Sequence, residues 1–199
     1  MRWNSTPSEM LTRSVFCLAN TKYWTKNAFW GIFRILQGGT GTMPAIKEVE
    51  AAKALMHEAI NWSVMRWLAE KKRVRKAADR ANELLDELNR QIKSAWSDEL
   101  KAAYAELSAN GKKTTVPVAY SGTISSEAKV FAKQVKQADD EAHWARMDAE
   151  DTFDLAEKRL STSMAREGSR KAIDSWVLHE KAIAKARAGV DATRTASEG

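Results

Sequence analysis

The sequence predicts an all-α protein in which two long helices form an antiparallel helical hairpin. Two segments, 46–108 and 125–187, are equal in length and rich in Ala, Glu, Lys, Arg and Leu, which favour helices most strongly. In both segments apolar side chains recur every eleven residues, which is three helical turns. Equal lengths around a modest connector favour a hairpin, because each helix then covers the apolar stripe of the other.

The first predicted helix begins after Pro44, since proline is tolerated in a first turn. No proline or glycine occurs between Pro44 and Leu107. Ser97, followed by two acids, can cap a new helix, so we expect a weak point there. The apolar stripe of this helix consists of Val74, Ala81, Leu85, Ile92, Trp96, Ala103 and Leu107.

A connector over 109–124 separates the two predicted helices. Asn110-Gly111 is a helix-ending and turn signal, and Pro117 and Gly122 prevent the helix from continuing. The hairpin domain is therefore expected to span 43–188 and to be followed by a disordered tail over 189–199.

The second predicted helix starts at Ser125 or Ser126, either of which can serve as its N-cap. Gly168 weakens a helix by about 1 kcal/mol relative to alanine, so a kink is expected there. The apolar stripe of this helix consists of Phe131, Ala138, Ala142, Ala149, Phe153, Leu160 and Met164. Because eleven residues in three turns is close to the natural helix period, the pair should be coiled-coil-like but nearly straight.

Four tryptophans, Trp62, Trp67, Trp144 and Trp176, cannot all face a single partner helix. Burying them requires that the helices fold back at weak points or that two hairpins associate into a four-helix bundle. We therefore expect a homo-oligomer, with folding back at the weak points as the alternative.

Residues 1–42 differ from the rest of the chain. They contain five basic residues against one acid, so most of the net charge of +6 belongs to them, as does Cys17, the only cysteine. The codons for Gln37-Gly38-Gly39 can contain a bacterial ribosome-binding element just before Met43, which favours a mis-assigned start and a non-native leader.

Two alternatives remain for 1–42: a disordered segment, or an interfacial helix over Asn27–Gln37 with an apolar face that lies on a membrane surface. If the protein starts at Met43, no membrane partner is expected, because the only membrane-like segment is then absent and no apolar run is long enough to span a bilayer. We expect a cytoplasmic location.

Two blocks of opposite charge are the candidate partner-binding residues. Through the connector, 66–80 mirrors 153–167, so the blocks should overlap only at their edges; a staggered hairpin or a contact between two chains would pair them more fully. The basic block comprises Arg66, Lys71, Lys72, Arg73, Arg75, Lys76 and Arg80. The acidic block comprises Asp139, Asp140, Glu141, Asp148, Glu150, Asp151 and Asp154.

A metal site where the two ends of the hairpin meet is an alternative. In the mirrored register residue 57 lies opposite 176, which would bring His57 and Glu58 near His179 and Glu180. Imidazole and carboxylate groups on facing helices can bind iron or manganese, but the Glu-x-x-His spacing of di-metal bundles is missing. The only similar spacing is Asp140-x-x-His143, and a hydrogen-bonded structural histidine is the more ordinary role for His179.

No nucleophile and base set, phosphate-binding glycine loop or Cys/His metal motif is found in the sequence. We therefore predict a non-enzymatic cytoplasmic scaffold or protein–protein interaction protein without a cofactor. The alternatives are a nucleic-acid-associated protein that uses the basic block, and a metal-binding helical bundle.

Overall fold

The computed structural model describes residues 43–109 and 120–198, with side chains over 44–108 and 120–191. The chain divides into two units, 1–44 and 45–199, and the description below concerns the second. The expectations for 1–42 fall outside the described residues, as does most of the predicted connector.

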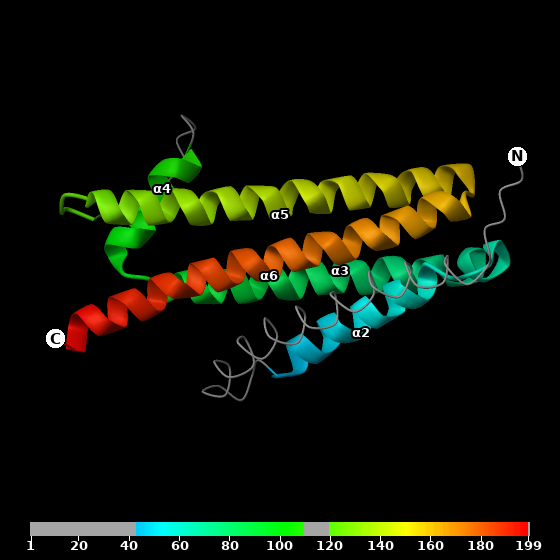
Figure 1. Ribbon diagram of the computed structural model, residues 1–199, viewed down its shortest axis with the longest axis horizontal. Coiled ribbons are helices and arrows are strands. Elements are labelled where there is room, and N and C mark those ends of the chain that lie inside the picture. Colours follow the sequence, from blue (N-terminus) through cyan, green and yellow to red (C-terminus); the bar gives the residue numbers. More distant parts are fainter. Residues whose placement is uncertain (1–42, 110–119, 199) are drawn as a thin grey trace, which may run out of the picture. The chain divides into compact units, whose positions relative to one another are not determined.

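The described residues are helical, which confirms the all-α class (Figure 1). Instead of two uninterrupted helices, the described part of the chain has five. They are α2 (Met43–Ala59), α3 (Val64–Ser94), α4 (Asp98–Ala109), α5 (Ser126–Arg159) and α6 (Thr162–Glu198). Each predicted long helix is thus divided, the first twice and the second once.

The first division separates α2 from α3 and was not predicted. Ser63 caps α3 with an extended backbone, and its Oγ accepts a hydrogen bond from the Arg66 amide at 3.4 Å. Trp62, directly before this cap, is buried in the core. The reversal brings α2 back along α3, so that Glu48 reaches Arg80 at 3.0 Å.

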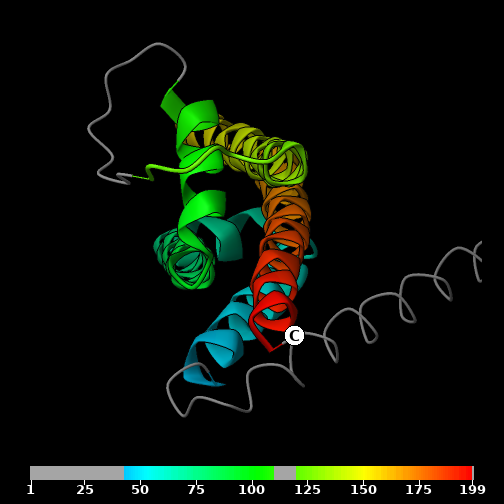
Figure 2. The same ribbon diagram turned by 90° about the vertical axis from the view of Figure 1, so that its left-hand side faces the viewer.

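The second division confirms the weak point at Ser97. Its Oγ accepts a hydrogen bond from the Leu100 amide at 3.3 Å at the start of α4. The preceding Trp96 is buried, and its Nε1 donates to the Ala186 carbonyl at 2.6 Å. In the view along the long helices, α4 crosses from the end of α3 toward α5 (Figure 2).

The predicted kink at Gly168 is wrong, because the second segment reverses at Leu160 instead. Leu160 has a left-handed backbone with φ of 50°, and Ser161 donates its amide to the Ala156 carbonyl at 3.0 Å. Gly168 lies inside α6, where a Cβ atom would come within 3.0 Å of the Phe153 ring. The glycine therefore permits close helix packing and does not bend the helix.

The reversal at Leu160 makes α5 and α6 an antiparallel pair (Figure 1). Near the turn Gly168 meets Phe153, and at the far end Gly189 is buried against Phe131 and Trp96. The helix α6 includes Gly189 and continues to Glu198. The disordered tail predicted from residue 189 is therefore wrong for the described residues.

The helix α3 contacts both members of this pair. Its Asp86 reaches Arg146 of α5 at 2.9 Å, and its Asn82 accepts a hydrogen bond from Trp176 of α6 at 2.8 Å. The helix α2 reaches α6 through Lys53 and Glu180, which are 2.5 Å apart. The same antiparallel register of α2 and α6 places residue 57 opposite residue 176, as the mirrored hairpin predicted.

Among the described side chains, the core consists of two buried clusters. The larger joins α2, α3, α5 and α6, and in it Trp67 stacks on Phe153 with ring centroids 6.2 Å apart. The smaller lies around Trp96 and includes residues of α4, the start of α5 and Ala186 of α6. Most of the predicted stripe is buried, but Leu160, which forms the turn, is 58% exposed.

Within the described part of the chain, no helix combines the length and the apolar character that crossing a membrane requires.

Candidate functional site

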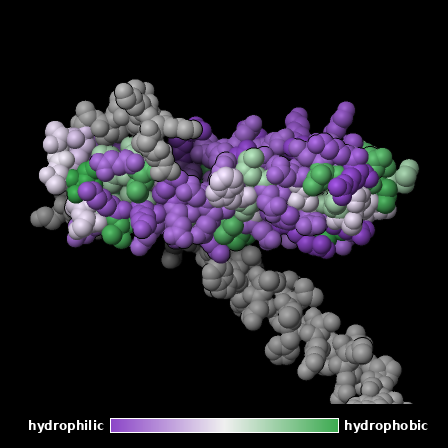
Figure 3. All heavy atoms as spheres, turned by 90° about the horizontal axis from the view of Figure 1, so that it is seen from above, coloured by the Kyte–Doolittle hydropathy of each residue, from purple (hydrophilic) through white to green (hydrophobic). Residues whose placement is uncertain are grey.

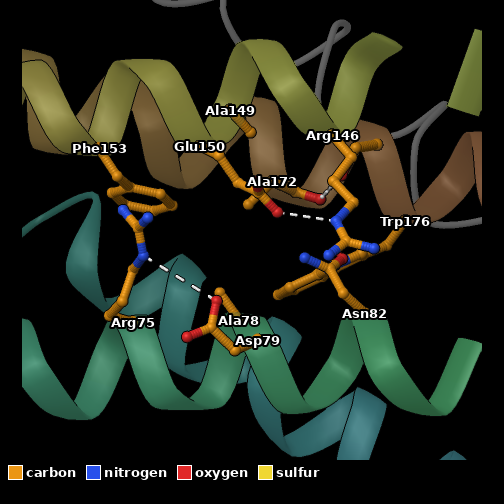
Figure 4. A pocket seen from close by; sticks show the side chains of 11 residues that line it. Arg75, Ala78, Asp79, Asn82, Arg146, Ala149, Glu150, Phe153, Ala172 and Trp176 are labelled. Carbon is orange, nitrogen blue, oxygen red and sulfur yellow. Dashed lines mark hydrogen bonds and ion pairs between the residues drawn. The ribbon is translucent and has the colours of Figure 1, made fainter. Parts of the chain in front are cut away.

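A polar layer lies where α3, α5 and α6 meet (Figure 4). Arg146 of α5 donates from Nε to Glu150 at 2.7 Å and from Nη1 to Asp86 of α3 at 2.9 Å. Beside it, the Trp176 indole donates to Asn82, and both side chains are buried. Because buried polar groups require partners, these contacts determine how the three helices pack together.

Burial shifts the pKa of two titratable groups in this layer, Asp79 and His179. Burial raises the pKa of the Asp79 carboxyl above its usual range, although Arg75 nearby opposes the shift. Burial lowers the pKa of His179, whose Nε2 lies 3.5 Å from Asp86, although the charge of Asp86 acts in the opposite direction. The neutral imidazole is thus favoured at neutral pH.

The pocket within the layer is very small. Its volume of about 10 Å³ holds roughly one water molecule. The pocket leaves no room for a substrate, and its charged lining residues contact one another, as Arg75 and Asp79 do. We therefore interpret the layer as a structural feature that aligns the helices.

A second polar cluster lies around Asp139. Its carboxylate accepts hydrogen bonds from Asn89 at 2.9 Å and from Lys93 and Tyr104 at 2.5 Å each. Burial, and then the bond to Asp139, raises the pKa of the Tyr104 hydroxyl well above its usual value. The phenol therefore stays protonated and joins α4 to α5.

Within the basic block, Arg75 contacts another helix, whereas other residues remain exposed at the surface. Arg75 turns toward α5, where its Nη1 lies 2.8 Å from Asp154. Lys72, Arg73 and Lys76 are exposed on the outer side of α3, and we call them the basic face. Among the described residues Lys71, Lys72 and Lys76 have no ion pair, whereas Arg66, Arg73 and Arg80 pair with Glu58, Glu70 and Glu48.

Most residues of the acidic block have a partner within the described part of the chain, in contrast to the lysines of the basic block. Asp139 and Glu150 bind their partners in the two polar clusters, and Asp148 reaches Lys171 at 3.0 Å. Asp140 pairs with Lys136, and Glu141 accepts from Gln137 at 2.9 Å. Within the described residues the two blocks meet directly at Arg75 and Asp154 alone, and Asp151 has no ion pair there. The blocks thus overlap at their edges.

Of the four tryptophans that one partner helix was not expected to cover, Trp144 is the one that stays exposed. Trp62, which lies between α2 and α3, and Trp67 and Trp176, which lie on helices, are buried because the chain folds back, whereas Trp144 is 68% exposed on α5. A signal was present in the sequence, because Trp144 lies outside the eleven-residue stripe and has acids three residues before it and four and seven after it.

Around Trp144 the outer side of α5 carries apolar and acidic side chains together. Figure 3, which looks down on α5, shows a mainly hydrophilic surface with separate hydrophobic spots. We call this surface the Trp144 face; it comprises Glu141, Trp144, Met147, Asp148, Asp151 and Leu155, all of them exposed.

The four residues considered for a metal have separate surroundings. His57 is exposed, Glu58 faces Arg66, Glu180 faces Lys53, and His179 faces Asp86. In the described ranges no group of three or more His, Cys, Asp or Glu side chains is placed to hold a metal ion.

No family model, curated protein or solved structure matches the chain.

Proposed function

We propose that this protein is a non-enzymatic cytoplasmic scaffold that acts by binding protein, and that its first partner is a second copy of itself. The observation that carries the proposal is the exposure of Trp144 in the middle of a well-packed helix. A solvated tryptophan adds little to folding, whereas burying it at an interface removes a large apolar surface from water.

The neighbours of Trp144 resemble the composition of interfaces. Aromatic residues and methionine are enriched at binding surfaces, and tryptophan is common among the residues that dominate binding energy. Met147 lies one turn from Trp144, and the charged side chains around them can form the polar rim. Helices of two copies would then lie side by side, as in a larger helical bundle.

Sedimentation velocity over micromolar to submillimolar concentrations tests this function. We expect the weight-average sedimentation coefficient to rise with concentration for the wild type. Trp144→Ala should weaken this rise, while Trp144→Phe should retain much of it. A wild type that stays monomeric at every concentration would contradict the proposal.

A second candidate function is binding of nucleic acid by the basic face. The observation in its favour is that Lys72 and Lys76 of the basic face are left without an ion pair in the described residues. Phosphate contacts give binding that weakens steeply with salt. Fluorescence anisotropy with duplex DNA at several salt concentrations tests it, and Lys72→Glu/Lys76→Glu should abolish any binding.

A further inference from the structure

We propose that the Trp144 face of one chain docks on the outer side of α3 of a second copy, with the two helices antiparallel. This inference rests on the proposed self-association and names the surfaces that perform it. The occupant follows from charge complementarity, since the Trp144 face is acidic and α3 carries the basic face.

The first argument is that the charges of these two surfaces remain largely unused within one chain. Lys72 and Lys76 have no ion pair among the described residues, and neither has Asp151. Asp148 does contact Lys171, but its side chain is still 60% exposed. Opposite charges left at the surface can steer two copies together and select their register.

The second argument is that both surfaces carry exposed apolar groups at matching positions. On α3, Met65 is 76% exposed, and it shares one side of the helix with Ala69, Lys72 and Lys76. On α5 the side chains at the same intervals are Trp144, Asp148, Asp151 and Leu155.

An antiparallel arrangement places apolar side chains opposite apolar ones and lysine opposite aspartate. Met65 then meets Leu155, and Lys72 meets Asp148. Lys76 lies over the Trp144 ring, where a cation–π contact becomes possible. A parallel arrangement would instead place Lys76 against Leu155, so the antiparallel register is the one that the side chains favour.

Charge reversal of each face, followed by mixing, tests the inference. We expect Lys72→Glu/Lys76→Glu and Asp148→Lys/Asp151→Lys each to raise the dissociation constant for self-association at least tenfold. An equimolar mixture of the two variants should regain association, because the reversed α3 of one is complementary to the reversed α5 of the other. Glu127→Lys/Lys185→Glu, which reverses exposed charges elsewhere, should behave as the wild type.

The outcomes separate this inference from the proposed function. If the wild type associates but the reversals or their mixture behave otherwise than expected, the faces are wrong and the scaffold function stands. If the wild type stays monomeric, both fail, and salt-dependent binding of DNA by that monomer would assign the basic face to nucleic acid. Circular dichroism confirms that each variant is folded, and Trp144→Lys provides an independent disruption at an exposed position.

Discussion

At the scale of single residues, burial decides which groups carry charge in this protein. His179 of α6 faces α3 with its side chain only 11% exposed, and the charged groups that act on it are Asp86, Asp139, Arg146 and Lys93. Because Asp86 already binds Arg146, it is shared between a permanent cation and a histidine that is neutral at neutral pH.

We predict that the free energy of unfolding falls as the pH drops below about 6.5. The pKa of His179 in the folded chain is below its ordinary value of 6.5, so the unfolded chain binds more protons between these two pKa values. Urea unfolding from pH 8 to pH 5 measures the effect. His179→Gln should reduce this dependence, whereas His57→Gln, at an exposed position, should leave it in place; equal slopes in all three proteins would contradict the prediction.

Gly168 is a second residue whose role depends on a single neighbour. Alanine would favour the helix by about 1 kcal/mol, but its Cβ would lie 3.0 Å from Phe153, whose ring is held by Trp67. Overpacking of this kind costs about 1–3 kcal/mol. We therefore expect Gly168→Ala to lower the free energy of unfolding by roughly 1 kcal/mol, measured by urea denaturation.

A double-mutant cycle identifies the cause of that loss. In a Phe153→Leu background the close contact is relieved, so Gly168→Ala should be neutral or stabilising there. The same loss in both backgrounds would show that the Phe153 ring is not responsible.

At the scale of elements, three interruptions turn two predicted helices into five. Ser63 and Ser97 act as N-caps, and their side chains satisfy amides at the starts of α3 and α4. The third interruption has no glycine, and Leu160 itself adopts the left-handed backbone. Such a conformation costs about 1–2 kcal/mol for a residue with a Cβ atom, so packing of α5 on α6 must supply it.

The turn leads to a prediction of increased stability. Leu160→Gly should raise the free energy of unfolding by about 0.5–1 kcal/mol, because glycine adopts positive φ without strain and the exposed leucine loses little contact. Leu160→Ala is the matched control and should show no gain. Thermal and urea unfolding measure the difference, and a less stable glycine variant would indicate that the Leu160 side chain contributes to the core.

At the scale of the whole described unit, the two core clusters predict unequal local stability. The cluster around Trp96 is the smaller, and it is the one that holds α4 in place. Segments with fewer buried contacts open at lower free energy than the main core. The molecule should therefore open at the α4 end before it unfolds globally.

Hydrogen exchange checks this expectation. Amides of α4 should exchange through openings of lower free energy than amides in the middle of α3. Trp96→Ala, which removes a buried ring and its bond to Ala186, should further reduce protection in α4 and lower the free energy of unfolding by about 3–5 kcal/mol. Equal protection of α4 and central α3 would indicate a single cooperative unit.

Much of the fold and part of the candidate site could be read from the residues themselves. The stripe through Val74, Leu85 and Trp96 is buried as predicted, because helix propensity and apolar periodicity are local properties. The charge blocks were also visible. The contacts of these charges were not visible: Asp139 accepts a hydrogen bond from Asn89 on α3, and Glu150 pairs with Arg146 one turn away on α5, so neither belongs to the proposed surface.

The sequence by itself therefore determined that the described residues are mainly helical and which side of α3 and of α5 is buried. Only the tertiary structure decided where the chain reverses, because a left-handed Leu160 is favourable only when two helices pack across it. The tertiary structure also decided which tryptophans are buried. Trp176 is buried because it packs on α3 and donates a hydrogen bond to Asn82, whereas Trp144 lies on the acidic outer side of α5 and stays exposed. These outcomes depend on which segments become neighbours, and the spacing of residues along one helix does not contain that information.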